Sequence, residues 1–256
     1  MLSFEELKSY LDQKAEEFQT PDFIGNDPMQ IPHRFELKQD IEIAGFLTAT
    51  ISWGNRKSII NSATRIMNHM GNNPYDFVLS FKESDLDFLT DQAVHRTFNG
   101  EDLKQFLRNL KRLYKERNSL ESYFALQDEE TDFYHGIERF RSSFLGSTTH
   151  RSSKHVSSPY KNSAAKRLIM YLRWMVRSNN KGVDFGLWDS LDPKYLSVPL
   201  DVHTGNISRK LGLVSRTQND WKTVHELDLA LRKMDPSDPS KYDFALFGLG
   251  VTKELE

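Results

Sequence analysis

The chain of 256 residues contains no cysteine. Without a thiol, the protein has no disulfide, no thiolate nucleophile, no cysteine-ligated zinc site and no iron–sulfur cluster. The first 18 residues, MLSFEELKSYLDQKAEEF, are acidic and amphipathic, and they lack the basic and apolar regions of a signal peptide. We therefore expect a cytoplasmic protein.

Long apolar runs are also missing. The longest fall far short of the roughly 20 residues that a membrane-spanning helix needs, so we expect no membrane association. Hydrophobic residues make up 38% and charged residues 27% of the chain, which is typical of a globular protein with a buried core. Alternating β patterns are scarce, whereas helical periodicity recurs along the chain.

This periodicity predicts an all-α fold. Ser3 followed by Glu6 forms a capping box at the start of the first helix. We expect helices over residues 3–18, 41–53, 56–70, 101–116, 118–127, 132–145, 163–178, 202–210 and 220–234, and a last apolar segment over 241–251.

Acidic residues are missing from one long stretch. Residues 151–181 hold eight Lys or Arg residues and no Asp or Glu, although the net charge of the whole chain is −2. Such a block is suited to following a phosphate backbone. A solvated helix face followed by a loop would look the same, and charge alone does not separate the two interpretations.

Two residues in the C-terminal half are candidates for chemistry. Asp201 follows Pro199 and opens a short helix, where an aspartate commonly caps the free N–H groups. Lys166 begins the amphipathic helix inside the acid-free block, where the simpler interpretation is a surface lysine. His203 alone suggests packing or a supporting role beside Asp201.

Signatures of other site classes are absent. The sequence has no HExxH, no aspartate-rich calcium loop, no GxSxG and no phosphate-binding GxxxxGK[ST]. We therefore expect neither a metal nor a cofactor.

Three segments carry a resemblance to a known superfamily. PLDVHTGNISRKLGL resembles the signature VDxHVxRxxxRLGL of the helix-hairpin-helix DNA glycosylases (HhH-GPD), with Asp201 at the position of the essential aspartate. NSAAKRLIMYLRWMVR places Lys166 where that superfamily has its catalytic lysine. FLTATISWGNRKSIINSA is similar to its LLSxQ-type helix and turn.

The number of residues between Lys166 and Asp201 indicates which branch of the superfamily the chain resembles. Lys166 and Asp201 are 35 residues apart, which is similar to the archaeal 8-oxoguanine glycosylase branch. Nearly the whole chain also looks like a bacterial family of unassigned function related to that branch, through the segments HRFELKQDIEIAGFLTATISWGNRKSII, HRTFNGEDL, KRLIMYLRWMVR, VDFGLW and YDFALFGLGV. Two departures stand out. SSPYKNSAAK replaces the hairpin LPGVGxKTA without its glycine pair, and Gly54 or Asn55 replaces the glutamine of LLSxQ.

The resemblance implies a two-lobed HhH-GPD fold with its active site in the cleft between lobes. The expected lobes are residues 40–178, and residues 1–39 together with 179–256. It implies a base-excision-repair glycosylase with AP lyase activity that removes an oxidised base, 8-oxoguanine being favoured. In that chemistry Lys166 attacks C1′ and forms a Schiff base, while Asp201 stabilises the positive charge that develops on the sugar.

Further roles follow from the same resemblance and from side-chain type. Candidates for the base pocket, whose alternative is core packing, are Trp53, Met170, Trp174, Phe244 and Phe247. Candidates for phosphate contacts are Lys154, Lys161, Arg167, Arg173 and Arg177.

We expect a monomer whose partner is DNA with damaged bases. Two alternatives stay open: a non-catalytic module of the same fold that binds damaged or distorted DNA, and a helical protein-interaction domain. The acid-free basic block disfavours the latter.

Overall fold

The computed structural model describes residues 2–147, 149–252 and 254. Helix accounts for 62% of the chain and strand for 3%, which confirms the all-α expectation. The α-helices are α1 (Phe4–Phe18), α2 (Lys38–Thr50), α3 (Arg56–His69), α4 (Pro74–Ser80), α5 (Gly100–Glu116), α6 (Tyr134–Leu145), α7 (Lys166–Val176), α8 (Val202–Lys210), α9 (Trp221–Met234) and α10 (Tyr242–Thr252).

Short elements join these helices. Strands β1 (Ala93–His95) and β2 (Phe98–Asn99) form an antiparallel hairpin. The 3₁₀ segments are η1 (Pro21–Asn26), η2 (Pro28–Gln30), η3 (Pro32–Arg34), η4 (Glu83–Leu86), η5 (Glu121–Phe124), η6 (Arg151–His155), η7 (Pro159–Lys161), η8 (Pro193–Tyr195) and η9 (Pro239–Lys241).

Three of these elements differ from the sequence-based expectation. The helix expected over 118–127 is only the 3₁₀ segment η5, because Ser119 and the Leu120 amide are held by the buried carboxylate of Glu42. The helix α4 was not expected from the sequence. It starts at Pro74, since proline is preorganised for the first position of a helix. The β1–β2 hairpin has too short a pattern to be recognised as strand.

The chain divides into two compact units. Unit 1 comprises residues 1–23, 126–135 and 158–256, and unit 2 comprises residues 24–125 and 136–157. This division differs from the expected lobes. Residues 158–178 belong with the C-terminal helices because α7 makes its ion pairs with residues of that unit, and residues 24–39 belong with the central helices.

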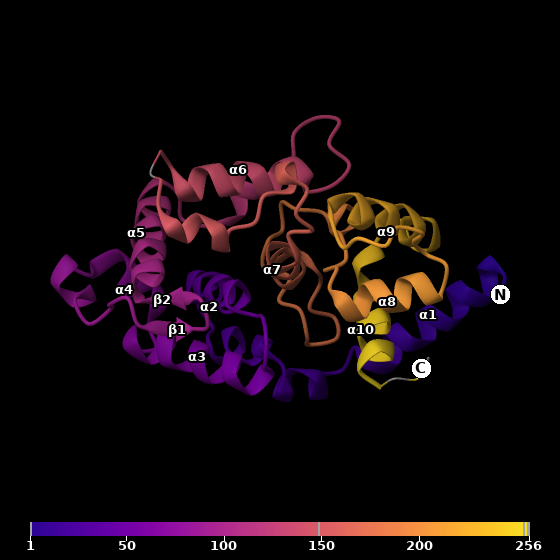
Figure 1. Ribbon diagram of the computed structural model, residues 1–256, viewed down its shortest axis with the longest axis horizontal. Helices are drawn as coiled ribbons and strands as arrows, with labels where there is room; N and C mark the ends of the chain where they lie inside the picture. Colours follow the sequence, from indigo (N-terminus) through magenta and orange to yellow (C-terminus); the bar gives the residue numbers. More distant parts are fainter. Residues whose placement is uncertain (1, 148, 253, 255–256) are drawn as a thin grey trace. The chain divides into compact units, whose positions relative to one another are not determined.

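Unit 2 is built around α2. This helix is buried on nearly all sides and packs against α3, α4 and η3 (Figure 1). Phe46 lies at the centre of an aromatic cluster with Phe106, Phe140 and Phe144, whose ring centroids are 5.0–5.7 Å from its own. The fully buried Glu42 accepts a hydrogen bond from the hydroxyl of Tyr114.

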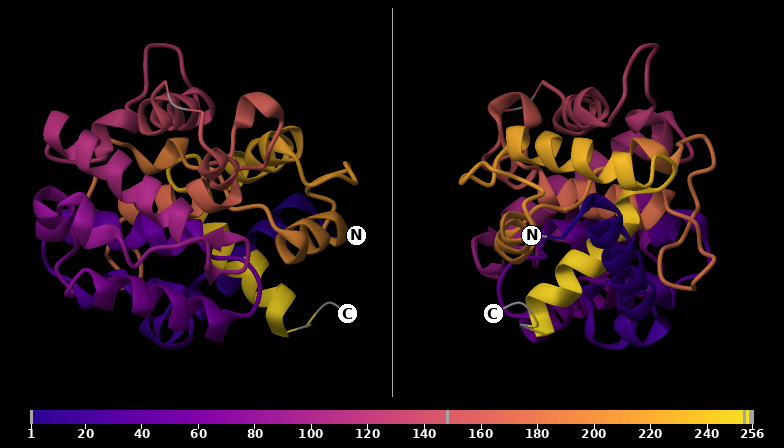
Figure 2. Two further views of the ribbon diagram at one scale, coloured as in Figure 1. Left: turned by 60° about the vertical axis from the view of Figure 1, so that its left-hand side comes forward. Right: turned by 90° about the vertical axis from the view of Figure 1, so that its right-hand side faces the viewer.

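Unit 1 places α10 between α1 and α8. Figures 1 and 2 show the first and last helices of the chain side by side. α10 is apolar on most of its surface, and its residues Phe244, Ala245, Leu246 and Leu249 are buried. α7 and the segment after it supply further core side chains, among them Tyr171 and Trp188, whose rings meet edge to face.

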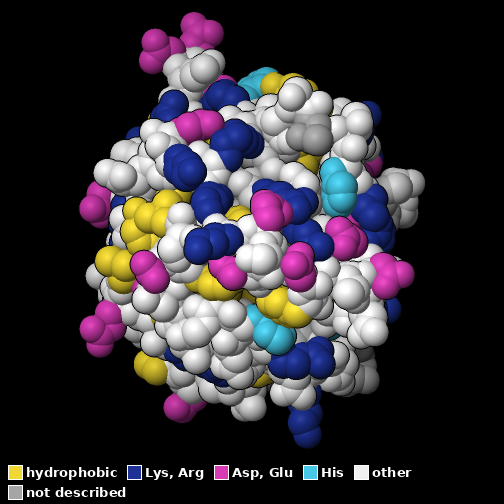
Figure 3. All heavy atoms as spheres, turned by 90° about the vertical axis from the view of Figure 1, so that its left-hand side faces the viewer, with side chains coloured by type: hydrophobic (Ala, Val, Ile, Leu, Met, Phe, Trp, Pro, Cys, Tyr) yellow, Lys and Arg dark blue, Asp and Glu magenta, His cyan; other side chains and the backbone are white. Residues whose placement is uncertain are grey.

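The surface mixes charges of both signs. On the face shown in Figure 3, basic and acidic side chains are interspersed with small hydrophobic groups. None of the helices in the described part of the chain combines the length and the hydropathy that crossing a bilayer requires.

Gly248 fixes the distance between α10 and α1. A Cβ at this position would lie 2.2–2.5 Å from three ring atoms of Phe18. We therefore expect Gly248→Ala to lower the free energy of unfolding by about 1–3 kcal/mol, as overpacking does in close-packed interiors. Denaturant unfolding measures the change. The control is Gly25→Ala, where a Cβ would meet nothing within 4 Å. Equal stability of the two variants would contradict the close packing inferred at α1 and α10.

Candidate functional site

The structure brings Lys166 and Asp201 together within unit 1. The Nζ of Lys166 lies 3.0 Å from the Oδ2 of Asp201. The lysine side chain is 34% exposed and the aspartate side chain 19% exposed, so the pair is accessible from solvent without being fully hydrated. Two residues that are 35 positions apart in the sequence thus form one ion pair at the first turns of α7 and α8.

Asp201 uses its two carboxylate oxygens differently. Its Oδ1 accepts a hydrogen bond from the backbone N–H of Thr204 at 2.9 Å, which caps α8. Its Oδ2 faces Lys166. The capping role predicted from the sequence is therefore confirmed, and it leaves the second oxygen for the lysine.

The surroundings of Asp201 favour its ionised form. Burial alone would raise the pKa of the Asp201 carboxyl. The positive charge of Lys166, the hydrogen bond from Thr204 and the charge of His203 outweigh burial, so the pKa of Asp201 lies below its ordinary value. At neutral pH the carboxylate is charged and meets the positive end of the α8 dipole.

The segment that leads to Asp201 is anchored on α9. The hydroxyl of Ser197 donates a hydrogen bond of 2.5 Å to the buried carboxyl of Asp228. The guanidinium of Arg232 donates to the carbonyl oxygens of Tyr195 and Leu196. Burial raises the pKa of Asp228 to about 7. These bonds fix the extended approach to the α8 cap.

A second set of contacts holds the backbone of Asp201. The side chain of Asn219 donates to the Asp201 carbonyl oxygen at 3.0 Å, and Arg209 donates to the Asn219 oxygen at 2.5 Å. Gly205 leaves room for this arrangement, because a Cβ there would lie 2.6 Å from the Asn219 oxygen. Arg209 and Gly205 both belong to the quoted signature segment, but Asn219 lies outside it.

The turn before Lys166 is anchored at the N-terminal end of α9, directly after Asn219. Asn162 donates to the carboxylate of Asp220, and its carbonyl accepts from the N–H of Trp221. Asn162 and Ala165 both have left-handed backbones, with φ of 59° and 47°. Glycine adopts this conformation at least cost, so the turn that lacks the expected glycine pair carries backbone strain just before Lys166.

A third charged group lies near the pair and was missed in the sequence. Asp243, on α10, is buried and forms an ion pair with Arg173. Burial raises the pKa of Asp243 to about 6. The charges of Asp201 and Asp184 act in the same direction, and those of Arg173 and Lys166 oppose them. The sequence feature that could have identified Asp243 is its position as a lone carboxylate inside the apolar segment KYDFALFGLGV.

The phosphate role predicted for Arg173 and Arg177 does not hold in this structure. Both side chains are less than 10% exposed. Arg173 pairs with Asp184 and Asp243, and Arg177 pairs with Asp184 and Asp238. Guanidinium groups buried in ion pairs cannot reach a DNA backbone, and they instead hold α7 to the C-terminal part of unit 1.

Two of the predicted base-stacking rings are core residues. Trp174 and Phe244 are each 1% exposed. The guanidinium groups of Arg173 and Arg177 lie 4.6 and 5.3 Å from the Phe244 centroid. The stacking role does not hold for these two rings, because neither presents a face to a ligand.

The half-buried candidates for the base pocket remain predictions. Met170 follows Lys166 by one turn of α7, and Phe247 follows Asp243 by one turn of α10, so each lies on the face of its helix that carries a charged site residue. Trp53 belongs to unit 2. Its half-buried ring is stacked on His155 at 5.9 Å and meets His95 edge to face.

The remaining phosphate candidates stay predictions too. Lys154 and Lys161 are exposed, and Arg167 is half-buried, where burial lowers its pKa to about 10. His203 is exposed and borders a pocket of about 300 Å³ between α8 and α10, which Arg209 and Lys210 also line.

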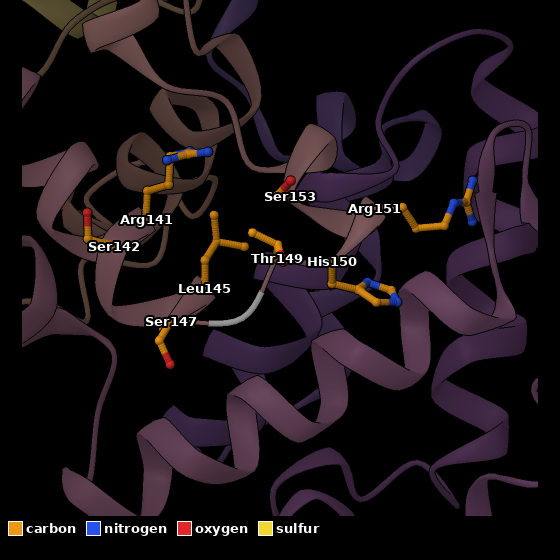
Figure 4. Close-up of a pocket in the computed structure, with 9 residues that line it drawn as sticks. Arg141, Ser142, Leu145, Ser147, Thr149, His150, Arg151 and Ser153 are labelled. Atoms are coloured by element: carbon orange, nitrogen blue, oxygen red, sulfur yellow. The ribbon is translucent and has the colours of Figure 1, made fainter.

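Unit 2 has a pocket of its own beside the end of α6. It measures about 580 Å³ and is lined mainly by hydroxyl and basic side chains (Figure 4). Its two arginines are already engaged: Arg141 pairs with Glu138, and Arg151 pairs with the fully buried Asp102. Because these pairs compensate the charge of both arginines, the pocket is a weaker candidate for an active site than the Lys166–Asp201 pair. Across the described ranges, no group of three or more His, Asp or Glu residues is arranged to hold a metal ion.

Comparison with known proteins gives a family and no activity. The family described as protein of unknown function (DUF2400) matches residues 27–252, and the chain belongs to this family. No curated protein and no solved structure matches the chain.

The raised pKa of Asp243 predicts a pH-dependent stability. Between its ordinary value of 3.8 and about 6, the folded protein retains a proton that the unfolded chain has lost. Rising pH through this window therefore lowers the contribution of Asp243 to stability. We expect Asp243→Asn to flatten the decline, measured by unfolding at pH values from 4 to 7. The exposed Asp189→Asn is the matched control and should keep the wild-type slope. An unchanged slope in Asp243→Asn would show that another group titrates.

Proposed function

We propose that this protein is a DNA glycosylase with AP lyase activity. It would extrude a damaged nucleotide from DNA and cleave its glycosidic bond through a covalent lysine intermediate. One observation carries the proposal. The lysine and the aspartate that match the superfamily signature, 35 residues apart, lie 3.0 Å from each other within one unit.

The two residues have distinct roles in the proposed reaction. The neutral amine of Lys166 attacks C1′ of the sugar while the bond from C1′ to the base breaks. The carboxylate of Asp201 stabilises the positive charge that develops on the sugar ring. The base leaves with the electron pair of its bond to C1′ and takes up a proton, and the lysine nitrogen loses one. The bond from C1′ to the ring oxygen O4′ then breaks and O4′ is protonated, which opens the sugar and gives a Schiff base. Loss of a proton from C2′ and departure of the 3′ phosphate by β-elimination then cleave the DNA strand. The capped, ionised state of Asp201 suits this electrostatic role, because Thr204 already holds its other oxygen.

The resting ion pair must give up a proton before the lysine can attack. The charge of Arg173 is compensated by Asp184 and Asp243, so Arg173 does not act as an unopposed cation beside the amine. Asp243 is a second carboxylate whose charge interacts with both members of the pair. With a pKa of about 6, Asp243 is ionised at neutral pH.

The finer parts of the proposal rest on resemblance. A two-lobed HhH-GPD fold and 8-oxoguanine as the preferred lesion follow from the similarity to the archaeal branch, and Met170 and Phe247 would then line the base pocket. A non-catalytic DNA-binding module needs no exposed lysine held by a capping aspartate, so the ion pair favours the enzyme.

Removing the amine tests the nucleophile. Lys166→Gln should abolish borohydride trapping of the protein on duplexes that carry oxidised bases or abasic sites, because a glutamine amide forms no Schiff base. The control is Lys222→Gln, which removes an exposed lysine of the same unit and should trap normally. Trapping that survives in Lys166→Gln would assign the nucleophile to another residue.

Removing the charge of Asp201 separates chemistry from capping. Asparagine remains a good cap, so Asp201→Asn should keep the stability of the fold within about 1 kcal/mol. We expect the single-turnover excision rate to fall about 100-fold or more, with little change in DNA affinity. Asp192→Asn is the matched control, since Asp192 also caps a segment and pairs with a lysine, Lys194. Normal turnover in Asp201→Asn would leave only the structural cap.

A further inference from the structure

A second segment of the chain is free of acidic residues. Residues 43–75 contain no Asp or Glu and include the whole of α3. On this helix Lys57, Asn61 and Arg65 follow one another at intervals of four residues, so they lie along one face, and all three are exposed. This face lies in unit 2, outside the unit that holds the proposed catalytic pair.

The β1–β2 hairpin adds a further cation beside this face. Arg65 donates to the carbonyl oxygen of Val94 at 3.2 Å, which ties the hairpin to α3. The exposed Arg96 occupies the hairpin turn, and its guanidinium lies against Gly54: a Cβ on Gly54 would be 2.3 Å from the Nη1 of Arg96. Gly54, with φ of +97°, thus provides the space for the arginine immediately before α3 begins.

Arg96 is held in this place at a cost. Its own φ is +52°, a left-handed conformation that an arginine rarely adopts. The neighbouring His95 is buried, and its two ring nitrogens contact the carbonyl oxygen of Trp53 and the hydroxyl of Ser62. The contacts of His95 therefore fix the turn next to Arg96, and they set the point from which the arginine side chain extends.

Several other cations of the protein are held in ion pairs, such as Arg108 by Glu83 and Arg151 by Asp102. In the part of the chain that the structure describes, no ion pair includes Lys57, Arg65 or Arg96. The nearest acidic residues in the hairpin sequence, Asp91 and Glu101, lie at the opposite end of the hairpin from its turn. The positive charges of Lys57, Arg65 and Arg96 are therefore available to an anionic ligand.

We infer that Lys57, Asn61, Arg65 and Arg96 form a surface that binds the phosphate backbone of a nucleic acid. The half-exposed indole of Trp53 lies next to this surface in sequence, between α2 and Gly54, where it packs on His155 and His95. Lys and Arg with an amide side chain are typical phosphate contacts that position a strand without reading its bases. The inference rests on the proposed function for its partner, and it assigns DNA binding to unit 2 as well.

Charge-removing variants of the full-length protein test this surface. We expect Lys57→Gln and Arg96→Gln each to weaken binding to an undamaged duplex about eightfold at 0.1 M salt, because each phosphate contact contributes about −0.9 to the slope of log K against log salt. The slope itself should become shallower by about that amount. Lys115→Gln is the matched control: it is exposed and lies near the C-terminal end of α5, whereas the hairpin precedes the start of that helix. Thermal unfolding verifies that each variant is folded.

The outcomes separate this inference from the proposed function. Wild-type slopes in both variants, or an equal loss in Lys115→Gln, would overturn the inference. So would competition by polyglutamate as effective as that by DNA, because the surface would then bind acidic protein. Borohydride trapping through Lys166 is measured on the same variants at saturating DNA and should persist. If the wild-type protein does not trap while the variants still lose DNA affinity, the proposed function fails and this surface stands.

Discussion

The ion pair between Lys166 and Asp201 depends on the start of α9. Asn219 holds the carbonyl of Asp201, and the next two residues, Asp220 and Trp221, hold the turn that precedes Lys166. Three consecutive residues therefore set the positions of two segments that are far apart in the sequence. A distance of 3.0 Å between two flexible charged side chains is maintained because both backbones are tied to the same short stretch.

Ion pairs of two buried arginines hold the helix that carries Lys166. Arg173 and Arg177 cross-link α7 to Asp184, Asp238 and Asp243 in unit 1, and these pairs compensate the charge of the buried carboxylates of Asp184 and Asp243. The network places Asp243 close enough to interact electrostatically with Lys166 and Asp201. The arginines that appeared to belong to a DNA-binding surface thus shape the electrostatics of the site from inside the core.

How far the sequence predicts this structure differs between its parts. The helices around Phe46 and over residues 202–210 follow from apolar spacing and capping residues, and the Asp201 cap follows from Pro199 and the helix it opens. The burial of Arg173 and Trp174 does not follow, because a helix that is buried on nearly every side looks amphipathic until its carboxylate partners are known. Those partners come from residues up to 70 positions away. Asp243 and Asn219 were missed for the same reason: their roles lie in contacts between segments distant in the sequence.

A left-handed backbone conformation is common to the two proposed contacts with DNA. In unit 1, a left-handed Ala165 precedes the lysine, and in unit 2, a left-handed Arg96 packs against Gly54. In both places an unfavourable backbone conformation is held by hydrogen bonds from neighbouring segments, through Asn162 and Asp220 in the first case and through His95 in the second. Such strain costs of order 1–3 kcal/mol and persists only where the surroundings overdetermine it. Because the backbone is held in place at both sites, the lysine and the arginine extend from fixed Cα positions, and only their side-chain rotamers remain to be ordered when a ligand binds.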